Sequence, residues 1–366
     1  MEQKIKSKNN ARLDWIDLSK SIGIFFVLLS HSQVNIPLVS GLGNLFYIGI
    51  FFVIAGYTYH DEEVPVVWFA WKKAKRVLVP YLQYSMALFL IISLKRILEG
   101  SFTKSETLTS LFGIIYARNQ IAREAVPGNS LLDVMNAPLW FLPAFYLSFV
   151  LFHVLVRIGK EKLLLFTLIS MIIGMSLHYL SPVLLPWSID TAFLFEGMFA
   201  AGYFAKLLMS EKKQSFCFCQ NLVKRADFQY LLVVGFFIGM LILQFYNGRM
   251  NLSIGDFGKT VYGGFFGVIF GAIFVMLLSK NIPWKIFAPF LQTGQNSMQI
   301  MAFHLLSFEI CKVLMNPFLP EFWDQNTLTS KLIRVVIVIG TMMFITRVSV
   351  WIRNWKKGRV DQYERT

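Results

Sequence analysis

The sequence carries little charge for its length. Of its 366 residues, 15% are charged and 55% are apolar. A soluble domain has roughly a quarter charged residues, because it needs a solvated shell. The composition therefore argues against a single globule in water and favours a protein whose surface contacts lipid.

Cysteine is scarce as well, with three residues in the whole chain. Cys217 and Cys219 lie too close together in the sequence for an ordinary disulfide framework. No cluster of Cys or His accompanies them to form a zinc site. We therefore expect free thiols and no bound metal.

Several functional motifs are missing from the sequence. It has no Walker-type glycine loop, which argues against ATP hydrolysis, and no H-E-x-x-H motif of the zinc peptidases. No inverted repeat with paired broken helices is visible, which weakens the interpretation as a secondary transporter. The N-terminus is basic and polar without a small-residue cleavage site, so we predict no removable signal peptide.

The formal net charge is +14. Nucleic-acid binding would require a basic domain in water, whereas membrane proteins are enriched in Lys and Arg in their cytoplasmic loops. We therefore expect no nucleic-acid partner. If the N-terminus is cytoplasmic, most Lys and Arg residues fall on the cytoplasmic side, including those near both termini.

Ten apolar stretches approach the length of about 20 residues that a helix needs to cross the hydrocarbon core. The sequence therefore predicts an all-α polytopic integral membrane protein with about ten transmembrane helices and both termini cytoplasmic. We expect one transmembrane domain over 1–366, with its core at about 12–353 and short cytoplasmic tails at 1–16 and 354–366. A short interfacial helix is predicted around Leu108–Arg118. The predicted spans lie near 17–38, 43–60, 77–97, 138–158, 163–182, 187–209, 228–247, 260–281, 293–316 and 331–353.

The first predicted span contains Lys20 and His31, which are 11 residues apart. At 100° per residue they lie on one helix face, about 16 Å apart along the axis. Lys20 would lie near the cytoplasmic surface and His31 deeper, where an imidazole can act as a general base. Alternatively, Lys20 snorkels to the surface and His31 caps a helix or bonds a neighbouring backbone group.

A second basic cluster precedes the third predicted span. Lys73 and Arg76 are spaced i,i+3, so they point the same way on a helix. Paired cations at a membrane surface suit phosphate groups. Alternatively, such a cluster sets the topology or contacts anionic membrane lipid.

Other polar and aromatic residues fall within or beside the predicted spans. Glu196 lies deep in apolar sequence, where a carboxylate either pairs with a cation or is functional. His304 is either a second member of the site or an interhelical hydrogen bonder, and we favour the latter. Trp140 lies in an aromatic stretch that is also typical of interfacial belts. The remaining histidines, which we expect to be solvated or interfacial, are His60, His153 and His178.

Five short elements follow one another along the chain. They are Lys20 followed by His31, Gly56-Tyr57, Lys73 and Arg76 before Pro80-Tyr81, Leu139-Trp140, and Asn296-Ser297 followed by His304. This set resembles the membrane-bound acyltransferase-3 family, especially its fucose 4-O-acetylase-like branch, from about 12 to 350. In that family the first residue of the basic pair is usually Arg. Here it is Lys73, a point charge in place of a planar fork.

The resemblance implies an O-acyltransferase that moves acetyl from cytoplasmic acetyl-CoA, as co-substrate, to a hydroxyl of an extracytoplasmic sugar. The acceptor would be a cell-surface polysaccharide (capsule, O-antigen of lipopolysaccharide, or exopolysaccharide) or its lipid-linked precursor. The location would be the bacterial cytoplasmic (inner) membrane. The alternative is a transporter or flippase of polyprenyl-linked sugars, which shares the many spans and the intramembrane polar groups.

The resemblance also suggests a role for each candidate residue. His31 would be the general base on the acceptor hydroxyl, or would itself form an acyl-imidazole. Lys20, Lys73 and Arg76 would bind the phosphates of the donor. Glu196 would be a supporting acid or a charge partner. The substrate path would be shaped by Tyr57, Trp140, Asn296 and His304.

Overall fold

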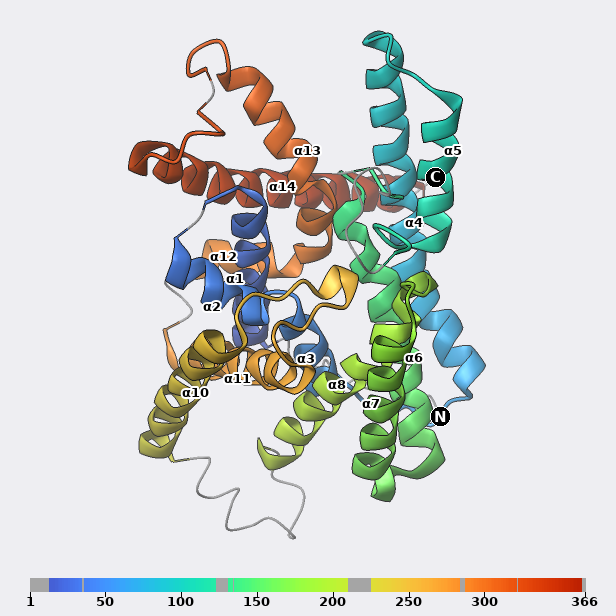
Figure 1. Ribbon diagram of the computed structural model, residues 1–366, viewed down its shortest axis with the longest axis vertical. Helices are drawn as coiled ribbons and strands as arrows, with labels where there is room; N and C mark the ends of the chain where they lie inside the picture. The colour runs from blue at the N-terminus through green and yellow to red at the C-terminus, as the bar shows by residue number, and fades with distance from the viewer. Residues whose placement is uncertain are drawn as a thin grey trace.

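The computed structural model describes residues 13–34, 36–122, 131–133, 135–209, 225–283, 287–320 and 322–363 (Figure 1). These residues form helices and connecting turns, and none of them belongs to a β-strand. Cys217, Cys219 and the two chain ends, at 1–12 and 364–366, lie outside the described residues.

The helices coincide with the predicted apolar stretches. Eight helical runs among the described residues are long and apolar enough to cross a membrane, and one of them, Ala137–Leu180, contains both α6 and α7. The predicted all-α polytopic membrane fold is therefore confirmed. The helices are α1 (Asp14–His31), α2 (Pro37–Phe46), α3 (Gly49–Thr58), α4 (Val66–Leu98), α5 (Lys104–Tyr116), α6 (Phe141–Gly159), α7 (Leu163–Leu180), α8 (Ile189–Met209), α10 (Ala226–Asn247), α11 (Val261–Asn281), α12 (Ala288–Gln295), α13 (Ser297–Met315) and α14 (Leu328–Tyr363).

Helix α1 is less apolar than these eight runs because Asp14, Asp17 and Lys20 occupy its first two turns. It nevertheless packs against α2, α3, α11, α12, α13 and α14. Asp17 is 2% exposed and Ile24 and Leu28 are fully buried, so protein surrounds most of this helix. A side chain on α1 can therefore meet residues from several distant parts of the chain.

Two predicted spans are interrupted in the structure. The stretch predicted at 43–60 contains the end of α2 and all of α3, which meet at Tyr47-Ile48. The stretch predicted at 293–316 contains the end of α12 and all of α13, which meet at Asn296. Such breaks are tolerated within a membrane where the freed backbone is buried in protein. Both breaks lie next to α1, as the contacts of α2, α3, α12 and α13 with that helix show.

The boundaries of two other helices differ from the prediction. Helix α4 begins at Val66 rather than near 77, so Lys73 and Arg76 belong to the same helix as the apolar span. Helix α14 runs to Tyr363, so most of the predicted tail at 354–366 is helical. The predicted interfacial helix is α5, which packs against α4 and projects with it at one end of the molecule (Figure 1).

Helices α3 and α8 are packed very closely. A Cβ atom on Gly56 would overlap the backbone carbonyl of Phe199, and one on Gly202 would overlap that of Val53. Small residues permit such close approach between helices in a membrane. The α3–α8 pair therefore forms a fixed wall beside α1.

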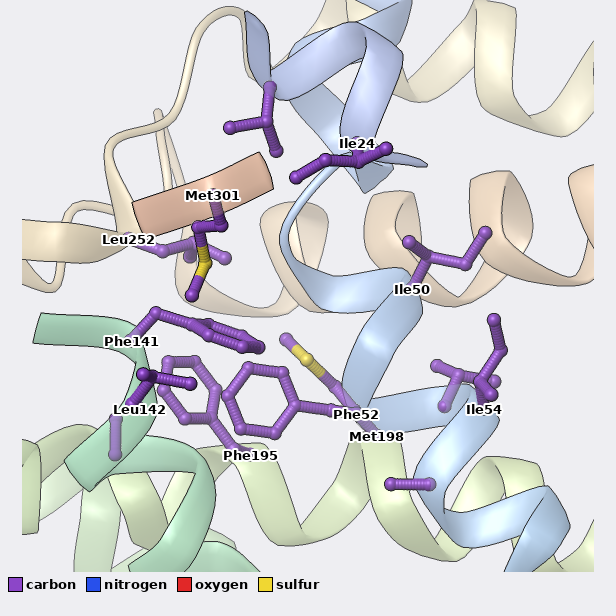
Figure 2. Close-up of a cluster of buried hydrophobic side chains, with 14 of the residues drawn as sticks. Ile24, Ile50, Phe52, Ile54, Phe141, Leu142, Phe195, Met198, Leu252 and Met301 are labelled. Atoms are coloured by element: carbon purple, nitrogen blue, oxygen red, sulfur yellow. The ribbon is translucent and has the colours of Figure 1, made fainter. Parts of the chain in front are cut away.

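An aromatic cluster occupies the centre of the molecule. The ring of Phe52 lies 4.3 Å from that of Phe195 and 5.3 Å from that of Phe141, measured between centroids. Figure 2 shows these three rings together, with Met301 beside Phe141. The cluster joins α3, α6 and α8, and Met301 of α13 lies beside it.

Candidate active site

A cavity of about 330 Å³ lies between α1, α3, α6 and the junction of α12 and α13. Lys20 lines it, and Thr58 and Gln295 contribute further polar groups. Most of the remaining wall is apolar, so the cavity combines one cation with a surface suited to an uncharged chain. The aromatic and thioether side chains in the wall are Phe51, Phe141, Phe145, Phe149, Met298 and Met301.

A smaller cavity, of about 30 Å³, adjoins the first. His31, Tyr47 and Trp140 line it, and His31 is accessible in spite of its position among packed helices. The residues that line both cavities are Phe51, Phe141 and Met301. The structure thus brings Lys20 and His31, at opposite ends of one helix face, to two cavities that share a wall.

The first turns of α1 are tightly joined to the α12–α13 junction. Lys20 lies 3.8 Å from a carboxylate oxygen of Asp17, and Gln295 donates a hydrogen bond of 3.2 Å to the same carboxylate. A Cβ atom on Gly294 would overlap the backbone carbonyl of Asp17. These contacts fix the position of the Lys20 side of the cavity.

Asn296 is buried at the N-terminus of α13, between two cavity-lining neighbours. Its Nδ2 donates to the carbonyl of Gln292 at 2.7 Å, and its Oδ1 accepts from Arg353 at 2.5 Å. Asn296 therefore connects α14 to the wall of the cavity but does not line the cavity itself. Arg353 is a residue that the sequence analysis did not select.

His304 lies beside His31. The centroids of the two imidazoles are 5.1 Å apart and their planes are inclined by 47°. His304 is fully buried, and its Nδ1 is 2.8 Å from the carbonyl oxygen of Met301 on its own helix. The structure therefore makes His304 a neighbour of His31, although 272 residues separate them along the chain.

Arg334, on α14, forms hydrogen bonds with the residues that directly follow α1. Its guanidinium is 2% exposed and donates to the carbonyl oxygens of Ser32 at 3.4 Å and Gln33 at 3.2 Å, directly after His31. It also donates to the carbonyls of Trp323 at 2.9 Å and Gln325 at 2.7 Å. Arg334 was not among the residues predicted from the sequence, although a lone arginine within an apolar span is a signal of a buried role.

The basic cluster at the start of α4 has one member in contact with the cavity wall. The Nζ atom of Lys73 lies 3.6 Å from the centroid of the Phe149 ring, which lines the larger cavity. Arg76 is exposed one turn further along the helix. Lys72 donates to Glu62 at 2.6 Å, and this hydrogen bond lowers the pKa of the Glu62 carboxyl group.

Two candidate residues lie away from the two cavities. Both carboxyl oxygens of Glu196 are buried, and neither has a hydrogen-bond partner among the described residues. Tyr57 lines a separate apolar cavity of about 200 Å³, together with Trp15 and Lys280. The structure does not bring either residue to His31.

His153 is not solvated, so that part of the expectation is wrong. It is fully buried, stacks on Phe69 with 3.8 Å between ring centroids, and lies 2.8 Å from the hydroxyl of Tyr59. Its position near the end of an apolar stretch suggested an interface, but the loop between α3 and α4 folds over it. Tyr47, which lines the His31 cavity, was also not among the predicted site residues.

The fold and the site define a helical membrane protein in which a cation and an imidazole line adjoining internal cavities. This chain belongs to the acyltransferase-3 family, since the family profile described as an acyltransferase domain matches residues 13–353. The chain is therefore a membrane acyltransferase. Comparisons with curated proteins and with solved structures gave no match.

Proposed function

We propose that this acyltransferase is an O-acetyltransferase of the fucose 4-O-acetylase-like branch, located in a bacterial inner membrane. It moves acetyl from cytoplasmic acetyl-CoA to a hydroxyl of a cell-surface polysaccharide or of its lipid-linked precursor. The observation that carries the proposal is the pair of adjoining cavities, with Lys20 on one and His31 on the other.

The larger cavity suits the acyl end of a thioester donor. Its wall is mainly apolar, which fits an uncharged acyl chain, while Lys20 supplies a positive charge. Lys73 contacts the same wall through Phe149, and Arg76 follows one turn later on α4. These cations would bind the donor phosphates, because charge-assisted hydrogen bonds to phosphate are strong.

His31 would act as the general base. Its ring nitrogen takes the proton from the acceptor hydroxyl while the hydroxyl oxygen attacks the thioester carbonyl carbon. The new C–O bond forms, the C–S bond breaks, and the departing thiolate recovers the proton from His31. In the covalent alternative, a ring nitrogen of His31 attacks the thioester carbonyl carbon, and the C–S bond breaks to release the thiolate. The acceptor hydroxyl oxygen then attacks the acetyl carbon, the C–N bond breaks, and the hydroxyl proton passes through the freed imidazole to the thiolate.

The other candidate residues would have supporting roles. Trp140 is 3% exposed and lines the His31 cavity, so it would shape the place where the acceptor hydroxyl enters. Asn296 would hold the cavity wall through Arg353. Glu196 and Tyr57 lie elsewhere, so we expect their substitution to affect catalysis less than that of His31.

The decisive experiment is transfer of label from radiolabelled acetyl-CoA to lipid or polysaccharide in purified membranes. We expect label with the unchanged protein and none with His31→Ala at equal abundance in the membrane. His60→Ala is the matched control, because His60 is an exposed loop histidine. Its Nδ1 atom contacts only the backbone carbonyl oxygen of Thr58, two residues earlier, among the hydrogen bonds of the described residues.

Full transfer by His31→Ala would remove His31 from the mechanism. Absence of label in every membrane, together with sugar movement across the bilayer, would instead favour a transporter or flippase of polyprenyl-linked sugars. Mass spectrometry of the surface glycan from a deletion strain and its parent would identify the acceptor.

A further inference from the structure

The two imidazoles near the smaller cavity differ in their surroundings. His31 is accessible and lines the cavity, whereas His304 is fully buried behind it on α13. Their ring centroids are 5.1 Å apart. Neither ring forms a hydrogen bond or ion pair with a carboxylate among the described residues, so no acidic group orients His31 as in a Ser-His-Asp triad.

The hydrogen bonds of His304 determine which of its nitrogens carries the proton. Nδ1 lies 2.8 Å from the carbonyl oxygen of Met301 and 3.2 Å from that of Ile300. A carbonyl oxygen can only accept, so Nδ1 must be the donor. In the neutral ring, Nε2 is then an acceptor with a free lone pair.

This acceptor is an exception among buried polar atoms. Nε2 of His304 is buried and has no hydrogen-bond partner among the described residues. Most buried polar side-chain atoms are hydrogen-bonded, because leaving one unpaired costs the desolvation of that atom. A specific partner is therefore expected, and the ring of His31 is the neighbouring polar group that can turn toward it.

We propose that Nε2 of His304 accepts a hydrogen bond from one ring N–H of His31 and thereby makes His304 the positioning residue of the reaction. This inference rests on the proposed function. The hydrogen bond holds His31 in a single tautomer, with its other ring nitrogen unprotonated and directed into the cavity. That nitrogen takes the acceptor proton and returns it to the departing thiolate, while the proton shared with His304 stays in place.

Arg334 supports the same geometry through the backbone. Its hydrogen bonds to the carbonyls of Ser32 and Gln33 fix the end of α1, so that only the side-chain torsions of His31 remain to be set. His31 faces His304 from α1, and Arg334 reaches the end of α1 from α14.

Two substitutions of His304 separate the proposed role from a packing role. In His304→Gln, the amide oxygen can stand near the position of Nε2 and accept the hydrogen bond. In His304→Asn, the amide can keep the contact with Met301 but does not reach His31. We expect kcat of acetyl transfer to fall on the order of 100-fold in His304→Asn and less than about 10-fold in His304→Gln, with KM for acetyl-CoA unchanged in both.

Equal losses in the two variants, or a rise in KM with kcat unchanged, would overturn the positioning role. If neither variant folds, ¹⁵N NMR of histidine-labelled unchanged protein decides, since a mixture of His31 tautomers contradicts the proposal. No acetyl transfer by the unchanged protein would instead refute the proposed function, and the inference with it.

Discussion

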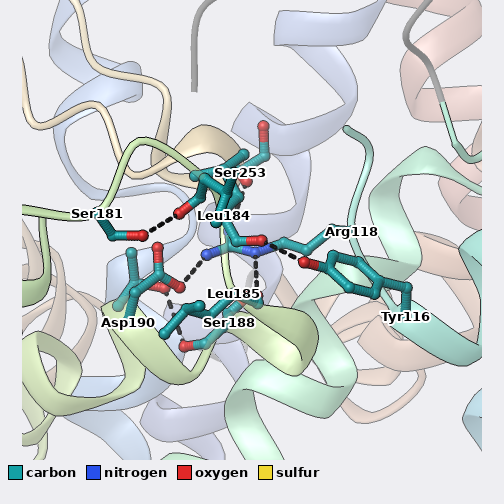
Figure 3. Close-up of polar contacts among 10 residues, drawn as sticks. Tyr116, Arg118, Ser181, Leu184, Leu185, Ser188, Asp190 and Ser253 are labelled. Carbon is teal, nitrogen blue, oxygen red and sulfur yellow. Dashed lines mark hydrogen bonds and ion pairs between the residues drawn. The ribbon is translucent and has the colours of Figure 1, made fainter. Parts of the chain in front are cut away.

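Arg118 and Asp190 form an ion pair in which both side chains are fully buried (Figure 3). Arg118 also donates to the carbonyl oxygens of Leu185 at 3.1 Å and Ser253 at 2.8 Å. One guanidinium thus connects the segment after α5, the start of α8 and the loop between α10 and α11. None of these segments is adjacent in the sequence.

Removal of one member of this pair should destabilise the protein strongly. Breaking a buried ion pair leaves one uncompensated charge, at a cost of about 3–5 kcal/mol. We expect Arg118→Met and Asp190→Leu each to lower the thermal unfolding temperature of the purified protein in detergent. The double variant should recover much of the loss, because it leaves no charge unpaired. Equal destabilisation by the double variant and by Arg118→Met would show that the backbone hydrogen bonds, and not the ion pair, dominate.

Replacement of Lys20 should weaken donor binding without removing chemistry. A hydrogen bond to a charged group contributes about 1.5–3 kcal/mol, so we expect KM for acetyl-CoA to rise about 10-fold or more in Lys20→Ala, with a smaller effect in Lys20→Arg. Steady-state kinetics in membranes measure both constants. Lys95→Ala is the control, because Lys95 is an exposed lysine paired with Glu309 and Glu99. An unchanged KM in Lys20→Ala would remove Lys20 from the donor site.

The Glu62–Lys72 pair should make a small, pH-dependent contribution to stability. The hydrogen bond from Lys72 lowers the pKa of Glu62 in the folded protein. A lowered pKa stabilises the fold above the unfolded pKa, and that stability is lost as the pH falls through the folded value. The pair is partly exposed, so we expect less than about 1 kcal/mol. Unfolding temperatures of Glu62→Gln and the unchanged protein should differ at pH 7 and converge once the pH has fallen below the lowered pKa of Glu62. A difference that persists in acid would contradict the assignment.

The break between α12 and α13 and the close packing of α3 on α8 had no clear signal in the sequence. Gly294 and Gly56 are placed where a Cβ atom would overlap the backbone of a neighbouring helix. Hydropathy identifies a long apolar stretch but carries no information on which helix will approach it. Hydropathy therefore predicted the helical stretches at 43–60 and 293–316 but not the interruptions within them.

Part of the candidate site could be predicted from the sequence. The spacing of Lys20 and His31 placed them on one face of one helix, and the structure has them on adjoining cavities. By contrast, Tyr57 lies on a separate cavity, and His153 is buried against Phe69. Each of these two placements depends on contacts between helices, which sequence spacing does not describe.

Hydropathy and helical periodicity are local properties, so the order of residues was enough to predict an all-α membrane protein and the common face of Lys20 and His31. The place of His304 beside His31, and the hydrogen bonds from Arg334 to the end of the same helix, arise from packing between helices. Those neighbours come from α13 and α14, and their positions depend on how closely the intervening helices pack.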